Sequence, residues 1–465
     1  MSAHERRESV AYQVHDERRY RLLQGKEVYA VTPLAFTEDV SNDEGRTRGR
    51  RVPHLEGLRG ILAVQTLLWI FFRVFCPGVV DATIEGAPRW TMIVRKVLSP
   101  LLFDGSLQAA AYMLLVGRVA LLTYLERREA IDLAGPCFRR PFRLLIPTAI
   151  ALAITSGLVA GKGFAYSQYM ADHLNNPAAS PPPIWGSTVE YFNSLASLFF
   201  SPAPYTNSRA VTFLQPAGIS WYIVIAFQQL YVLIIFAWTL PYTVLRYKII
   251  GLTALILLSA WVGRWSWYTV TGLAMAEFSV VYRQTLHPKP RVTVGSRRIP
   301  LYLFPLAMFL VGVMFKYLWA GLPQYADREL VAHANVNTAK LDWDALQEHK
   351  AVPRYDDYLV CVGLLGLVEL SHSARRVLSW RPLTYLGRLG FSIALTSGLI
   401  MVSLGSVVYY CLVESLGFQA QSSSTTAVLF FIFVPLCLVC ADIYSRLVDD
   451  VSLWASRFLF HFFRT

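Results

Sequence analysis

Apolar segments long enough to cross a lipid bilayer recur along most of this chain. An α-helix of about 20 apolar residues spans the roughly 30 Å hydrocarbon core of a membrane. Ten segments approach that length, at residues 58–76, 107–125, 143–161, 219–240, 247–263, 266–282, 299–320, 357–373, 389–412 and 425–445. The pattern predicts an all-α fold, a polytopic transmembrane bundle of ten helices.

The fifth and sixth of these segments are the weakest. Only the turn Gly263–Trp265 separates residues 247–263 from residues 266–282. Two interpretations stay open for this pair, because non-helical backbone at membrane depth needs protein or water around it. The pair is either one bent element or two re-entrant helices.

The charges of the connecting loops give the predicted helices a direction. Cytoplasmic loops of membrane proteins carry an excess of Lys and Arg. Residues 283–298 and 374–388 contain basic residues and no acid, whereas residues 321–357 carry seven acids against four bases. The basic loops all fall on one side of a ten-span arrangement, which predicts that both termini lie in the cytosol.

The composition agrees with a membrane protein. Of the 465 residues, 54% are hydrophobic and 16% are charged, whereas a soluble domain has about 25% charged residues. The net charge is +12, but the basic residues lie in short loops, so they indicate topology and not a nucleic-acid partner. The polar residues 1–53 predict a disordered cytosolic tail. One membrane-embedded domain is expected over residues 54–460.

Five short motifs occur in chain order along this domain. They are His54–Gly60 (HLEGLRG), Phe138–Pro147 (FRRPFRLLIP), Thr271–Glu277 (TGLAMAE), Arg381–Ser392 (RPLTYLGRLGFS) and Ala441–Asp450. In order and spacing they resemble acyltransferase family 3, and in particular its fungal branch. That family consists of ten-helix membrane enzymes that move acyl groups onto hydroxyls.

The resemblance implies an acyl-CoA co-substrate on the cytosolic side and no bound cofactor. It implies that Arg59, Arg139, Arg140 and Arg143 hold the donor phosphates, since guanidinium groups bind phosphate through two parallel hydrogen bonds. The alternative is that these arginines only set the topology. No cluster with metal-ligand spacing occurs in the sequence, so no metal is expected.

The chain departs from the family at the positions that carry its chemistry. Ile70 stands where the family has a histidine, and Gln228 stands where it has a carboxylate. Ala394–Ser397 replaces a Tyr-Leu-x-His sequence. Acyl transfer needs a base that takes the proton of the attacking hydroxyl, and neither an isoleucine nor a glutamine can do so. The base therefore has no assignment from the resemblance.

Two other sets of residues could supply an imidazole. His54 lies at the inner edge of the first segment, near Glu56, and Glu369 and His372 have i, i+3 spacing on one predicted helix face. A carboxylate beside an imidazole orients and polarises it. The catalytic candidates are therefore His54, Glu369 and His372, with a plain interfacial role as the alternative.

Ionisable residues within the apolar segments are costly in lipid and are candidates for function. They are Arg73, Arg118, Arg264, Glu277, Lys316, Glu369, Glu414 and Asp442. Arg118 and Glu277 are the most central. Either several helices line a polar cavity, or these side chains form buried ion pairs.

Three functions are compatible with the sequence. The first is a membrane-bound O-acyltransferase in an endomembrane, which moves an acyl group, such as acetyl, from acyl-CoA to a small metabolite of secondary metabolism or a sugar. The second is a family member that has lost acyl transfer and acts as a carrier or scaffold. The third is an enzyme that isomerises or cyclises a lipophilic substrate, with Glu277 or Asp442 as proton donor.

Overall fold

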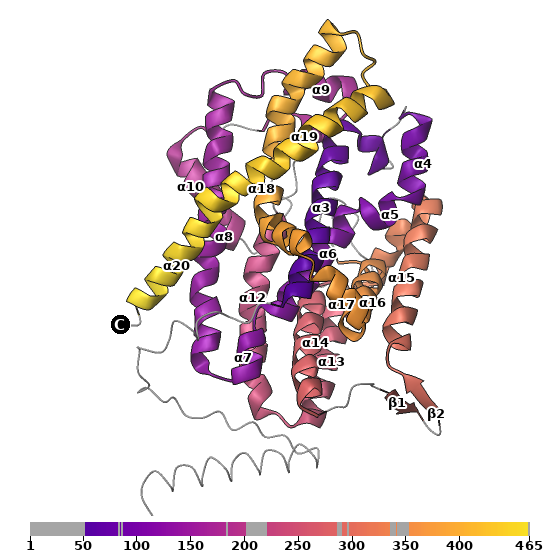
Figure 1. The fold of residues 1–465 in the computed structure, drawn as a ribbon, viewed down its shortest axis with the longest axis vertical. Coiled ribbons are helices and arrows are strands. Elements are labelled where there is room, and N and C mark those ends of the chain that lie inside the picture. The colour runs from indigo at the N-terminus through magenta and orange to yellow at the C-terminus, as the bar shows by residue number, and fades with distance from the viewer. Residues whose placement is uncertain are drawn as a thin grey trace, which may run out of the picture. The chain divides into compact units, whose positions relative to one another are not determined.

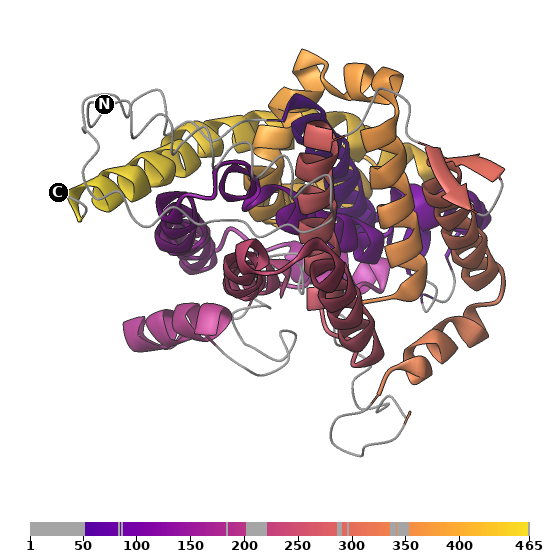
Figure 2. The same cartoon turned by 90° about the horizontal axis from the view of Figure 1, so that it is seen from below.

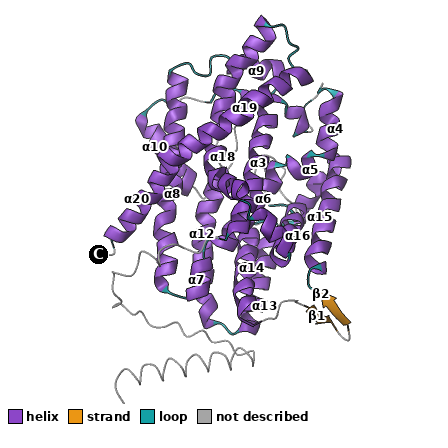
Figure 3. Cartoon of the chain, viewed as in Figure 1, coloured by secondary structure: helices purple, strands orange, loops and turns teal. Residues whose placement is uncertain are grey.

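Nearly all of the structured chain is helical (Figures 1 and 3). The computed structural model describes residues 52–463, apart from residues 82–83, 85–86, 183–184, 201–220, 286–290, 295–296, 335–340 and 342–352. Of the predicted cytosolic tail, residues 1–51 lie outside the described residues. The helices are α3 (Pro53–Phe75), α4 (Arg89–Val97), α5 (Ser99–Leu102), α6 (Gly105–Val119), α7 (Leu122–Arg127), α8 (Ala130–Ala160), α9 (Ser167–Leu174), α10 (Thr188–Phe200), α12 (Trp221–Thr239), α13 (Leu245–Trp261), α14 (Ser266–Thr285), α15 (Leu303–Gly321), α16 (Tyr355–Leu370), α17 (His372–Leu378), α18 (Arg381–Tyr410), α19 (Ser423–Tyr444) and α20 (Asp450–Phe462).

Shorter elements complete this list. The 3₁₀ segment η5 covers Pro323–Ala332, and the π-helical turn η8 covers Ser445–Asp449 between α19 and α20. Strands β1 (Arg291–Val294) and β2 (Arg297–Pro300) form an antiparallel hairpin in a loop that the sequence analysis did not expect to contain strands.

Several helices are long and apolar enough to cross a membrane. In the described part of the chain there are seven of them, or eight if α16 and α17, bent by 100° at their junction, count as one span. The ten predicted segments all coincide with helices wherever they are described, but α13 and α14 are not among these seven or eight. The fold is therefore that of a multi-pass membrane protein.

The chain divides into two compact units. The larger unit contains Val52–Met113, Phe138–Gln228 and Leu301–Thr465, and the described part of the smaller unit consists of Leu114–Cys137 and residues of Gln229–Pro300. Each unit has its own helix packing.

In the larger unit, the indigo α3 and the orange α18 lie side by side (Figure 2). Small residues let their backbones approach closely. A Cβ atom on Gly60 would lie 2.0 Å from the carbonyl oxygen of Leu383, and one on Gly387 would lie 2.0 Å from that of Glu56. Both helices therefore begin at the same end of the unit.

Helix α19 contacts both α3 and α8 in the larger unit. The Cys76 Sγ atom, just after α3, lies 3.1 Å from Thr426 Oγ1 near the start of α19. At the other end of α19, the Tyr444 hydroxyl donates to the Pro147 carbonyl of α8 at 2.5 Å. Hence α19 runs antiparallel to α3.

In the smaller unit, α13 and α14 are two helices that pack against each other. Gly263, in the turn between them, has φ +64°, which favours glycine. A Cβ atom on Gly117 of α6 would lie 2.0 Å from the Thr269 carbonyl oxygen of α14, so this contact also requires a small residue. The structure thus rules out a single bent element for residues 247–282.

Candidate functional site

Three charged side chains interact electrostatically, through Arg143, at the end of the larger unit where α3 begins. Arg59 comes from the second turn of α3, Arg143 from α8, and Asp449 from the π-helical turn η8. Arg143 interacts electrostatically with both Arg59 and Asp449. Arg59 is half-buried, Arg143 is exposed, and Asp449 is only 5% exposed. We refer to these three residues as the arginine–aspartate cluster.

The polar atoms of this cluster lack partners. Among the described residues, neither Arg59 nor Arg143 makes a hydrogen bond or an ion pair, and the Asp449 Oδ1 atom is buried without a hydrogen-bond donor. The Arg59 and Arg143 guanidinium groups repel each other, whereas Glu56 acts favourably on Arg59 and Asp449 acts favourably on Arg143. Because no hydrogen bond among the described residues fixes either guanidinium group, both keep N–H donors for an anion, beside a carboxylate oxygen that is buried and without a donor.

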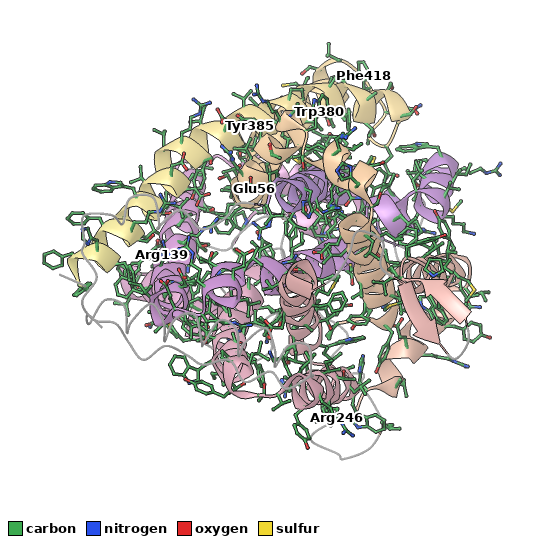
Figure 4. The ribbon with its side chains drawn as sticks, turned by 60° about the horizontal axis from the view of Figure 1, so that its bottom comes forward. Glu56, Arg139, Arg246, Trp380, Tyr385 and Phe418 are labelled. Carbon is green, nitrogen blue, oxygen red and sulfur yellow. The ribbon has the colours of Figure 1, made fainter. Side chains whose placement is uncertain are left out.

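The other two predicted arginines have local partners instead. Helix α8 begins at Ala130, so Arg139 and Arg140 lie inside the helix, whereas a loop was predicted up to residue 142. The Arg139 guanidinium stacks 5.7 Å from the ring centre of Phe460 on α20, and Arg140 Nη2 lies 3.5 Å from the Ala226 carbonyl oxygen. Arg139 is labelled in Figure 4. The third arginine on α8, Arg143, acts electrostatically on Arg59.

An aromatic pair borders the cluster. The Tyr112 side chain interacts electrostatically with Arg59, and its ring stacks on Tyr222 with a centroid separation of 6.3 Å and an interplanar angle of 21°. A Cβ atom on Gly390 would lie 3.3 Å from the Tyr112 hydroxyl oxygen, so the glycine leaves room for that hydroxyl.

The prediction that Glu369 and His372 lie on one helix face with i, i+3 spacing is wrong. Glu369 is half-buried near the end of α16, whereas the exposed His372 begins α17 after the 100° bend. Ser371 lies between them and accepts a hydrogen bond from the Ala374 N–H at 3.2 Å, which caps the new helix. Serine is a preferred residue immediately before the start of a helix. Ser371 was therefore the sequence signal that could have indicated this break.

His54 lies in the same region as α17. It is half-buried in the first turn of α3, and α17 packs on α3 where a Cβ atom on Gly57 would lie 1.7 Å from the Leu378 carbonyl oxygen. Figure 4 labels Glu56, Trp380 and Tyr385 around this packing.

The positions that depart from the family contain no acid or base. Ile70 is fully buried in the core of α3, and Ser397 is fully buried in α18. Gln228 is half-buried on α12. These positions therefore contribute packing or neutral hydrogen bonding.

A second charged group lies at the opposite end of the larger unit. Lys316 of α15 contacts Asp104 at 2.5 Å, Asp356 at 3.5 Å and also Asp357, all through Nζ. Lys316 is 5% exposed, and Asp357 is 1% exposed. The sequence indicates Lys316 as an ionisable residue in an apolar segment but does not indicate its partners, because Asp104 is more than 200 residues away in the chain.

Two charged residues between α15 and α16 extend this network. Arg354 lies 3.5 Å from Asp356 and 3.6 Å from Glu329. Burial raises the pKa of Glu329, and the neighbouring Asp356 raises it further, whereas Arg354 opposes the shift. Burial would lower the pKa of Arg354, but Asp356 and Glu329 outweigh it and the pKa is raised. The network links the loop to helices α15 and α16.

In the smaller unit, the buried-ion-pair interpretation is correct for Glu277. Its two oxygens accept from Arg128 Nη2 at 2.8 and 2.7 Å, and one of them also from Lys248 Nζ at 2.7 Å. Arg118 donates to the Ser279 hydroxyl at 2.9 Å. Each of these partners compensates part of the cost of burying a charge.

The carboxylate of Asp442 is also bonded to neighbouring side chains. It accepts from the Tyr385 hydroxyl at 2.5 Å and pairs with Arg446 at 2.9 Å. The carboxylates of Glu277 and Asp442 are thus engaged with neighbouring side chains, which makes them poorly placed as proton donors to a substrate. In the described residues, no group of three or more His, Cys, Asp and Glu side chains could hold a metal ion.

No protein-family model matches the chain, and no match was found among the curated proteins or the solved structures.

Proposed function

We propose that the chain is a membrane-bound O-acyltransferase that transfers an acyl group, such as acetyl, from acyl-CoA to a hydroxyl of a small metabolite or a sugar. The pair formed by Arg59 and Arg143 carries this proposal. These guanidinium groups come from two different helices and repel each other, and neither forms a hydrogen bond among the described residues, although Glu56 acts on Arg59 and Asp449 acts on Arg143 electrostatically. The phosphates of coenzyme A are the anions that would neutralise them.

The predicted topology supports an encounter with a cytosolic donor. We propose ten spans with both termini in the cytosol, in an endomembrane. Helices α3 and α18 start at the same end of the larger unit, and each follows a basic stretch of sequence. The positive-inside rule assigns that end, with Arg59 and Arg143, to the cytosol, where acyl-CoA is available.

A carrier or scaffold without acyl transfer is the second candidate. The observation that favours it is the absence of an acid or base at Ile70 and Gln228. The third hypothesis, isomerisation or cyclisation, is weaker, since Glu277 and Asp442 are engaged by neighbouring side chains.

Binding of coenzyme A to the purified full-length protein tests the proposal. Hydrogen bonds to a charged group contribute about 1.5–3 kcal/mol, so Arg59→Ala and Arg143→Ala should each weaken binding by roughly 10- to 150-fold. Arg246→Ala is the matched control, because Arg246 is an exposed arginine of another predicted inner loop (Figure 4).

Transfer of label from radiolabelled acetyl-CoA to a metabolite and lipid extract is measured in parallel. CoA binding with no transfer at any pH would favour the carrier. Failure of the wild-type protein to bind CoA, or equal binding by the Arg143 and Arg246 variants, would refute the proposal.

A further inference from the structure

The Asp449 carboxylate lies beside the proposed donor site in an unusual environment. It is 5% exposed, and its Oδ1 atom has no hydrogen-bond donor among the described residues. A buried carboxylate without partners is costly, and the charge that acts on it favourably is Arg143. Such a cost is commonly found where the group has a function.

The local backbone also sets Asp449 apart. Residues Ser445–Asp449 form a π-helical turn inside the long helical segment that continues into α20, and such turns frequently occur at functional sites. Tyr444, which precedes the turn, is fastened to α8 through the Pro147 carbonyl. Asp449 lies 26 residues after Ser423, the first residue of α19, which is about 39 Å along a helix and beyond the roughly 30 Å hydrocarbon core.

We infer that Asp449 is the general base of the acyl transfer, the role for which the family resemblance left no residue. This inference rests on the proposed function. The Asp449 carboxylate removes the proton from the acceptor hydroxyl as that oxygen attacks the thioester carbonyl carbon. The new C–O bond forms, the C–S bond breaks, and the thiolate of coenzyme A leaves. The proton then passes from Asp449 to the thiolate, which yields the ester and free CoA.

The position of Asp449 suits this step better than the positions of the other candidates. His372 is exposed and lies beyond the bend that follows Glu369, whereas Asp449 shares Arg143 with the donor site. An arginine that binds the donor and also faces the base places the two reacting groups near each other.

Asp449→Asn tests the inference, and Asp450→Asn is its matched control. Asp450 is the next residue and is exposed, so both variants remove one negative charge at nearly the same point. Both are assayed as full-length proteins for CoA binding, thermal stability and transfer from radiolabelled acetyl-CoA to a metabolite and lipid extract. General-base catalysis contributes about 10²- to 10⁴-fold. We expect that loss for Asp449→Asn, with CoA binding retained, and a change within about twofold for Asp450→Asn.

Asp449→Glu provides a second measurement that does not depend on the stability of the asparagine variant. It restores a carboxylate one methylene further out, so it should recover part of the rate and shift the pH at which the rate rises. Equal rates for the Asp449→Asn and Asp450→Asn proteins would overturn the inference, as would equal rates for Asp449→Asn and Asp449→Glu. If the wild-type protein neither binds CoA nor transfers the label, the proposed function itself fails, and the inference with it.

Discussion

The close contact between α3 and α18 predicts that a side chain at position 60 destabilises the folded protein. Gly60→Ala would place a Cβ atom 2.0 Å from the Leu383 carbonyl oxygen, 2.9 Å from the Leu383 carbonyl carbon and 3.1 Å from the Gly387 nitrogen. All three neighbours are backbone atoms, so no side chain can rotate away. A carbon and an oxygen normally lie more than about 3.3 Å apart, so the helices must separate by roughly 1 Å.

The cost of this separation falls on a buried interface. Overpacking of a well-packed core typically costs about 1–3 kcal/mol, and several close contacts repeat along α3 and α18. We therefore expect Gly60→Ala to lie at or above the upper end of that range. Arg59 is adjacent in sequence, so CoA binding should weaken as well.

Gly157→Ala is the control for this prediction. Gly157 lies inside α8, and a Cβ atom there would have no heavy atom within 4 Å. Alanine is the better helix former by about 1 kcal/mol, so this variant should be neutral or stabilised. Thermal unfolding of both proteins in detergent, followed by size-exclusion chromatography, measures the difference. If Gly60→Ala unfolds at the same temperature as Gly157→Ala, the close packing of α3 and α18 described above is incorrect.

Three further predictions concern topology and charge. Membrane-impermeant labelling should reach tags in residues 321–357 from outside and tags in residues 283–298 from the cytosol, and a common side for both would disprove the ten-span topology. Lys316→Met leaves three contacting carboxylates without their lysine. The free energy of unfolding should therefore fall by about 3–5 kcal/mol when measured by chemical denaturation, and an unchanged denaturation midpoint would contradict this. Because the folded-state pKa of Glu329 is raised, its stabilising contribution is present below its ordinary pKa and is lost as pH rises through the raised value. The stability of the wild-type protein relative to Glu329→Gln should therefore fall as pH rises, and a constant difference would exclude this titration.

Much of the helix content could be predicted from the sequence, because burial in lipid demands long apolar runs that satisfy their own backbone hydrogen bonds. The segment 247–263 was among the weakest predictions, and α13 there has only 17 residues. The start of α8 could not be placed from hydropathy, since Arg139 and Arg140 are polar residues inside a helix. Helix boundaries at polar residues depend on packing partners such as Phe460.

The candidate site was only partly predictable. Arg59 and Arg143 were named from short motifs, and the structure brings these two together. Asp449 was recognised only as part of a closing motif. Its burial and its unpaired oxygen arise in the folded chain, where Tyr444, the residue before η8, is hydrogen-bonded to Pro147 of α8, and no local sequence pattern encodes that contact.

The sequence by itself determined that this chain is a multi-pass helical membrane protein, because lipid imposes the same length and apolarity on every spanning helix. It also determined the charge asymmetry of the loops. Only the tertiary structure decided which charges meet. Lys316 and Asp104 are 212 residues apart, and Arg59, Arg143 and Asp449 come from three separate helical elements. Interactions across such separations depend on how helices pack and at which depth their side chains meet, and periodicity along one segment carries no information about either.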